Sequence, residues 1–99
     1  MTDFTTLALR RELIDSASAR GFDRMTPVQA QTLPSILAGE DVLAQAETGS
    51  GKTAAFGFGL LNKLAVEQAE TQALVLCPTR ELADQVGQAL RQFAATIPN

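Results

Sequence analysis

The sequence contains no histidine, no tryptophan and no tyrosine, and it has a single cysteine among its 99 residues. The absence of histidine excludes catalysis by an imidazole base and metal sites built on imidazole. Cys77 cannot form an internal disulfide, and because it ends an apolar run we predict a buried thiol in a reducing compartment. The five phenylalanines are therefore the only aromatic side chains that could stack on a planar ligand.

Long apolar runs and an excess of basic residues are also missing. The longest apolar run, near Ala54 to Leu61, is too short to cross a bilayer, and the N-terminus lacks the features of a secretion signal. The formal net charge is −3 at pH 7, so nucleic acid would have to be held by a few placed cations. We therefore expect a soluble, cytoplasmic protein with one small domain.

The most informative stretch is the run Ala46-Glu47-Thr48-Gly49-Ser50-Gly51-Lys52-Thr53. Its two glycines allow a tight turn whose backbone N–H groups face inward, where a phosphate can approach closely. Lys52 supplies a cation for the β- and γ-phosphates, Thr53 a hydroxyl for Mg²⁺, and the following helix a positive dipole end. The strict pattern has glycine in place of Ala46. The alternative is a glycine-rich connector that merely carries a lysine.

The capping residues and apolar runs along the chain predict alternating helices and strands. The helices are expected at about Leu7 to Ala19 with Thr6 as cap and Gly21 as stop, from Thr26 as cap to Gly39 with a kink near Pro34, at about Lys52 to Gln68, and from Thr79 as cap to about Ala95. The strands are expected at Val42 to Ala46 and at Ala73 to Cys77.

This order predicts an α/β fold with a right-handed βαβ unit, in which helices flank parallel strands. Residues 1–40 supply two helices, and residues 41–99 the phosphate-binding loop and the βαβα segment. Two parallel strands alone would leave both edges open, so we expect an incomplete sheet, a piece of a larger one.

Three blocks lie in a fixed order along the chain. The first is Gly21-Phe22-Asp23-Arg24-Met25-Thr26-Pro27-Val28-Gln29, the second is the phosphate-binding loop, and the third is Pro78-Thr79-Arg80-Glu81-Leu82-Ala83. Together they resemble the DEAD-box RNA helicases, over nearly the whole chain. The sequence of residues 71–86 is most similar to that of the bacterial DbpA helicases of this family, which act on ribosomal RNA during large-subunit assembly. The resemblance implies a P-loop, RecA-like fold.

In that family the first block is the Q motif, which reads adenine. A glutamine amide can donate to adenine N7 and accept from its N6 amino group at once, so the resemblance implies this role for Gln29. It also implies that Phe22 stacks on the base, that Arg24 and Thr26 shape the pocket and that Phe4 packs beside it. Taken alone, Gln29 would be interpreted as a polar residue on the exposed face of its helix.

The third block resembles the family's motif Ia, where the start of a helix meets the RNA backbone. Pro78, Thr79 and Arg80 would then contact RNA through helix amides and one guanidinium, without reading its sequence. A capped helix start whose Arg80 pairs with a surface carboxylate is the alternative. Phe56 and Phe58 are expected in the core.

The Asp-Glu-Ala-Asp block that the family needs for hydrolysis is absent, as are its Ser-Ala-Thr motif and its second RecA-like domain. We therefore expect an N-terminal piece of the first RecA-like domain of an ATP-dependent RNA helicase, which binds ATP and Mg²⁺ but cannot hydrolyse ATP alone. Another P-loop NTPase and a non-enzymatic nucleotide-binding fragment remain the alternatives.

Overall fold

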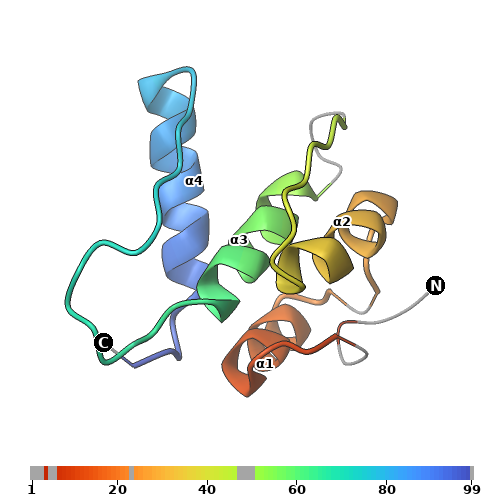
Figure 1. Cartoon of the computed structure of the whole chain (residues 1–99), viewed down its shortest axis with the longest axis horizontal. Helices are drawn as coiled ribbons and strands as arrows, with labels where there is room; N and C mark the ends of the chain where they lie inside the picture. The colour runs from red at the N-terminus through yellow and green to blue at the C-terminus, as the bar shows by residue number, and fades with distance from the viewer. Residues whose placement is uncertain (1–3, 5–6, 23, 47–50, 99) are drawn as a thin grey trace.

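The computed structural model describes residues 4, 7–22, 24–46 and 51–98. Four helices form this part of the molecule: α1 (Arg11–Ala19), α2 (Pro27–Leu37), α3 (Lys52–Asn62) and α4 (Arg80–Phe93). Helix α2 packs along α3, α3 packs against α4, and α1 contacts α4 (Figure 1). Helix α3 therefore lies at the centre of the arrangement, with its N-terminus directly after the glycine-rich loop.

The helix starts follow the capping residues of the sequence. Thr26 caps α2 with its side chain, Pro27 fills the first turn, and the Thr79 hydroxyl accepts a hydrogen bond from the N–H of Leu82 (3.1 Å) at the start of α4. Gly39 adopts a positive φ of 86° just after α2. These predicted boundaries are confirmed, because each uses a residue that satisfies a free backbone group or accepts a left-handed turn.

Two helices are shorter than the sequence predicts. Helix α1 begins at Arg11 rather than near Leu7, and the predicted cap Thr6 lies outside the described residues. The Asn62 side chain explains the late start: it accepts from the N–H of Arg10 (2.6 Å) and donates to the carbonyl of Ala8 (3.3 Å). These bonds hold residues 8–10 in an extended path across the end of α3.

Helix α3 ends at Asn62 and not near Gln68. The guanidinium of Arg10 donates to the carbonyl of Leu64 (3.5 Å), and the side chain of Gln72 bonds to both the N–H and the carbonyl of Ala65 (2.8 Å each). These partners satisfy backbone groups beyond the helix, so the helix needs no further turn.

One apolar core joins the helices to the N-terminal segment. Its buried members are Phe4, Leu9, Leu13, Ala17, Met25, Leu33, Ala54, Phe58, Leu61 and Phe93. Phe58 is fully buried, as predicted, with its ring 5.5 Å from that of Phe4 and 4.9 Å from that of Phe93. Phe56 is only half-buried and does not belong to this core.

The predicted sheet is not confirmed, because the described residues contain no strand. Both segments expected as strands run without regular structure, and their leucines are exposed: Leu43 by 96%, Leu74 by 79% and Leu76 by 84%. Figure 1 shows the two segments on opposite flanks of α3. A strand needs a neighbouring backbone to bond to, and neither segment finds one among the residues that the structure describes.

Two smaller expectations concern the burial of Cys77 and the length of the apolar helices. Cys77 is half-buried rather than enclosed, because its segment lies on the surface. Among the described helices, none is long and apolar enough to cross a membrane.

Candidate functional site

Gln29 faces the start of its own helix. Its Oε1 accepts a hydrogen bond from the N–H of Thr26 (2.9 Å), while its own N–H donates to the Thr26 hydroxyl (3.4 Å). This reciprocal pair is a capping box, and it fixes the side-chain oxygen toward the helix end. Gln29 is only 4% exposed, so the interpretation of an exposed polar residue is wrong.

The same side chain reaches the glycine-rich loop. Because Oε1 is bonded to Thr26, the amide nitrogen points away from it, and Nε2 donates to the carbonyl of Gly51 (3.1 Å). The two residues are 22 positions apart in the sequence. The first predicted block and the phosphate-binding loop are therefore in direct contact.

Glycine is the only residue type that this contact accepts at position 51. Its φ is +94°, and a Cβ at this position would lie 2.5 Å from Nε2 of Gln29 and 2.9 Å from the Thr26 hydroxyl. A side chain would thus be strained by the backbone and would also push the glutamine away. The last glycine of the loop allows the loop and the capping box to meet.

The start of α3 has no side-chain cap. Gly51 supplies no polar side chain, and its carbonyl accepts from the N–H of Ala55 (3.1 Å) as well as from Gln29. Lys52 is exposed and Thr53 is half-buried, and both belong to the first turn of the helix. Uncapped N–H groups beside an exposed lysine form a favourable environment for an anion.

Four predicted loop residues, Glu47, Thr48, Gly49 and Ser50, lie outside the described residues. Ala46 is described and half-buried. The part of the predicted phosphate site that can be placed therefore consists of Ala46, Gly51, Lys52 and Thr53.

The other residues of the first block lie along the connection into α2. Phe22 is half-buried, Arg24 is exposed and Thr26 is half-buried. The ring of Phe22 stacks against that of Phe4, with the centroids 6.3 Å apart and the planes inclined by 29°. Phe4 itself is 3% exposed, so it supports the Phe22 ring from the core side.

The third block begins α4. Thr79 caps the helix, and Pro78 and Arg80 are exposed. No carboxylate pairs with Arg80 among the described residues, so the ion pair considered above is not present there. Helices α3 and α4 both begin towards the top of Figure 1, but their first turns lie apart.

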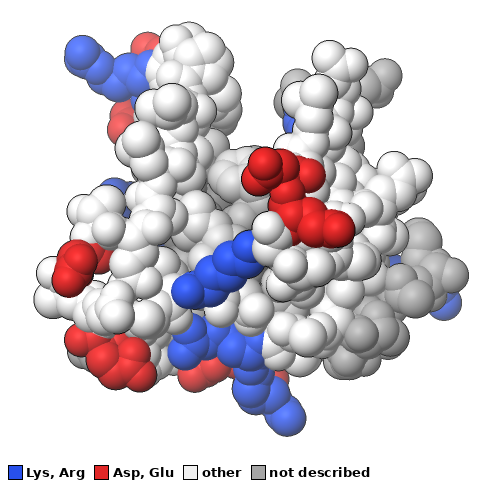
Figure 2. Space-filling view, viewed as in Figure 1, with Lys and Arg blue, Asp and Glu red and all other residues white. Residues whose placement is uncertain are grey.

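The surface charge is mixed. On the face shown in Figure 2, lysine and arginine side chains are interspersed with aspartate and glutamate, and no broad basic patch appears. The described residues hold no cluster of three or more acidic or cysteine side chains that could bind a metal ion. A metal ion at this site would need ligand atoms from a nucleotide in addition to the Thr53 hydroxyl.

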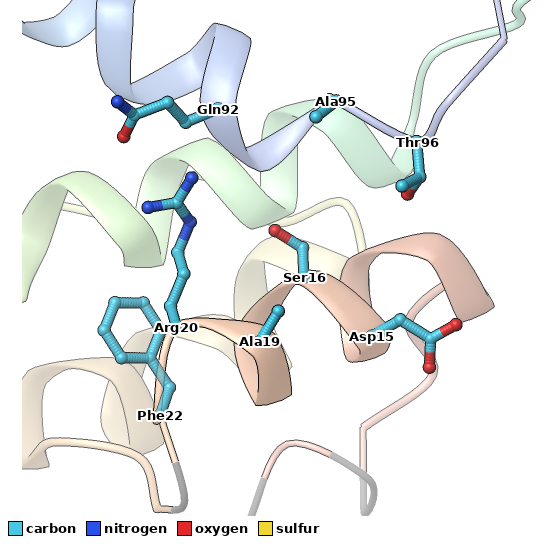
Figure 3. A pocket seen from close by; sticks show the side chains of 8 residues that line it. All are labelled: Asp15, Ser16, Ala19, Arg20, Phe22, Gln92, Ala95 and Thr96. Atoms are coloured by element: carbon cyan, nitrogen blue, oxygen red, sulfur yellow. The ribbon is translucent and has the colours of Figure 1, made fainter.

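A separate open pocket of about 620 Å³ lies between α1 and the end of α4. Figure 3 shows its lining, in which Arg20 extends from the end of α1 toward Gln92 on α4. The Arg20 guanidinium also lies 5.2 Å from the centroid of the Phe93 ring. This pocket shares only Phe22 with the predicted nucleotide residues.

The direct bond between Gln29 and Gly51 was not foreseen from the sequence. The sequence does contain a signal for the position of the glutamine, since threonine followed three residues later by glutamine is the pattern of a capping box. That pattern places the glutamine side chain at the helix start. It contains no information on which loop would lie against it.

The sequence family described as DEAD/DEAH box helicase matches residues 26–98. The ATP-dependent RNA helicase DbpA of Escherichia coli strain K12 is 57% identical over 100 residues, which cover all of this chain and 22% of the relative. The DEAD-box ATP-dependent RNA helicase CshA of Bacillus cereus is 49% identical over 90 residues, or 91% of this chain and 17% of the relative. The chain thus spans about a fifth of the length of these relatives.

Solved structures agree in fold. A DEAD box protein from the hyperthermophile Methanococcus jannaschii superposes with a TM-score of 0.91 and 34% identity, over all of this chain and 27% of that chain. Dbp5 of S. cerevisiae bound to RNA and ADP BeF3 gives a TM-score of 0.90 and 33% identity, over 96% of this chain and 25% of that chain. The four helices therefore have the arrangement that they have in much longer proteins.

Proposed function

Since the chain belongs to the DEAD/DEAH box helicase family, we propose that it is the ATP-binding N-terminal portion of an ATP-dependent RNA helicase. In the whole protein, ATP binding and hydrolysis would be coupled to the opening of RNA duplexes. The similarity to a DbpA helicase extends the proposal to ribosomal RNA as the substrate and large-subunit assembly as the setting.

The observation that carries the proposal is the hydrogen bond from Gln29 Nε2 to the carbonyl of Gly51. A primary amide has two N–H donors and an oxygen with two lone pairs. Thr26 and Gly51 use one of each. No other bond to this amide is present among the described residues, which leaves one donor and one acceptor, the pair needed to bond N7 and the N6 amino group of adenine.

The remaining roles follow the geometry of the helix starts. The N–H groups of the loop from Ala46 to Gly51 would surround the phosphates, with Lys52 beside the β- and γ-phosphates. Bound Mg²⁺ would neutralise phosphate charge and would be held by the Thr53 hydroxyl together with phosphate oxygens. Phe22 would stack on the base, with Arg24 beside it.

Pro78, Thr79 and Arg80 would contact RNA. The exposed guanidinium of Arg80 and the first N–H groups of α4 suit a phosphate of the RNA backbone. Such contacts hold RNA without selecting a sequence. Because the surface charge is mixed, RNA binding would rest on this local contact. Few counterions should therefore be released when RNA binds, and the RNA affinity should depend only weakly on the salt concentration.

Nucleotide competition tests the adenine site. The purified chain is expected to bind ATP more tightly than GTP by about one to two decades, since guanine presents acceptors where adenine presents a donor and an acceptor. Gln29→Glu retains the acceptor for the Thr26 N–H but loses the amide donor, and should reduce the preference to below about threefold. Displacement of a fluorescent nucleotide measures both affinities.

Gln31→Ala is the matched control, because Gln31 is an exposed glutamine on the same helix. It should leave the preference unchanged. Lys52→Ala should weaken ATP and GTP equally, since Lys52 touches only phosphates in this proposal. Equal binding of ATP and GTP by the unaltered chain would instead favour another kind of P-loop NTPase.

Hydrolysis requires groups that this sequence does not contain, because no Asp-Glu-Ala-Asp block is present to hold Mg²⁺ and orient water. The 99-residue chain should bind ATP without turning it over. Sustained release of phosphate that disappears in Lys52→Ala would contradict this statement.

A further inference from the structure

Asn62, the last residue of α3, binds the backbone of the N-terminal segment with both atoms of its side-chain amide. Its Oδ1 accepts from the N–H of Arg10 (2.6 Å), and its Nδ2 donates to the carbonyl of Ala8 (3.3 Å). In an extended chain these two backbone groups point to the same side, so the amide takes the place of a neighbouring peptide group. Residues 8–10 are thereby fixed to the end of α3.

A second contact seats the same segment on the same helix. Phe58 and Asn62 are four positions apart in α3, so they lie on one face of it. The ring of Phe58 meets that of Phe4 edge to face, with the centroids 5.5 Å apart. The N-terminal segment is therefore held on this face of α3 by a ring contact at Phe4 and by hydrogen bonds at residues 8–10.

The ring that this segment supports belongs to Phe22. The backbone of Phe22 is held at the end of α1, where its N–H donates to the carbonyl of Ala17 (2.9 Å). Its ring lies against Phe4, with the centroids 6.3 Å apart and the planes inclined by 29°. The backbone bond fixes where Phe22 starts, and the contact with Phe4 fixes how its ring is turned.

We propose that Asn62 is a positioning residue of the base site: by fixing residues 8–10 on α3, it holds Phe4 against Phe22, so that the Phe22 ring is presented to the base of a nucleotide. The inference rests on the proposed function, in which Phe22 stacks on the base. Lys52 and Asn62 are the two ends of α3, about 15 Å apart along the helix axis. Asn62 therefore acts on the base and not on the phosphates.

Three competing ligands separate the base site from the phosphate site. In displacement of a fluorescent nucleotide from the purified chain, Asn62→Ala should weaken ATP and GTP alike, by about fivefold or more, because stacking on a ring does not distinguish the two bases. Inorganic tripolyphosphate, which has no base, should bind as before. A general loss of stability would weaken all three ligands equally. The preference for ATP over GTP should persist, because Gln29 keeps its bonds.

Gln72→Ala is the matched control. The Gln72 amide also bonds one backbone N–H and one backbone carbonyl, both of Ala65 (2.8 Å each), but its partners lie in residues 65–68. This variant should leave all three affinities unchanged. Asn62→Asp retains the acceptor for the Arg10 N–H and should lose less affinity for ATP than Asn62→Ala. Because Asn62 is only half-buried and Gln72 is exposed, circular dichroism should show all three variants folded.

A double variant tests whether Asn62 acts through Phe4. Phe4→Leu keeps an apolar side chain in the core but removes the ring beside Phe22. In that background Asn62→Ala should change ATP binding by less than about twofold, since the ring that it positions is gone.

Four results would each overturn the inference: unchanged ATP and GTP binding in Asn62→Ala, an equal loss for tripolyphosphate, losses that multiply in the double variant, or an Asn62→Asp chain as weak as Asn62→Ala. An unaltered chain that binds ATP no more tightly than tripolyphosphate would refute the base site, and the proposed function with it. The two failures are therefore distinguished by the unaltered chain alone.

Discussion

At the scale of single residues, Gly51 is constrained twice. Its backbone has a left-handed φ, and the space where a Cβ would stand is occupied by the side chains of Gln29 and Thr26. Gly39 also has a positive φ, of +86°, but nothing lies within 4 Å of its Cβ position. A comparison of the two glycines therefore distinguishes the effect of the left-handed backbone, which both share, from the effect of the contact with Gln29, which only Gly51 has.

Replacing each glycine with alanine measures the two effects. Gly39→Ala should lower the free energy of unfolding by about 1–2 kcal/mol, the cost of the left-handed backbone alone. Gly51→Ala should cost about 1–3 kcal/mol more, because the new methyl group also breaks the bond to Gln29. Urea unfolding of both variants gives the difference. Equal losses would show that the Gln29 contact adds nothing to stability.

At the scale of the helices, the packing of α2 on α3 depends on a missing side chain. Gly59 is buried in α3, and a Cβ there would collide with the side chain of Ile36 on α2. Gly87 occupies the middle of α4, where a Cβ would meet only the end of Arg91, at 3.8 Å. Both are helical glycines, but only one is needed for close approach of two elements.

Alanine should therefore have opposite effects at these positions. Gly87→Ala should raise the free energy of unfolding by about 0.5–1 kcal/mol, because it removes the entropy cost of glycine in a helix. Gly59→Ala should lower it by about 1–3 kcal/mol through overpacking. Thermal unfolding followed by circular dichroism measures both, and combining Gly59→Ala with Ile36→Ala should recover part of the loss. A stabilising Gly59→Ala would contradict the packing described.

At the scale of the whole molecule, Phe58 connects segments that are distant in the sequence. Its ring contacts those of Phe4 and Phe93, near the two ends of the chain. The core is therefore continuous from the N-terminal segment to the end of α4. A single continuous core should unfold in one step.

We therefore expect a sharp thermal transition for the unaltered chain, which would show an autonomously folding unit. Phe58→Ala should cost about 3–5 kcal/mol and remove the sharp transition, since that is a large share of the stability of a small domain. The control is Phe56→Ala, at a half-buried position of the same helix, which should cost less than about 2 kcal/mol. A broad transition in the unaltered chain would indicate an incomplete fold.

The sequence by itself determined the features that depend on neighbouring residues: the caps at Thr26 and Thr79, the turn at Gly39, and the family. Capping and turns are local, so a few neighbouring residues suffice to specify them. Only the tertiary structure decided that Gln29 is buried against Gly51 and that α3 ends at Asn62. Within the part of the chain that the structure describes, it also left the predicted strands unpaired, because a strand forms only where another backbone lies beside it, and residues 42–46 and 73–77 lie on opposite flanks of α3.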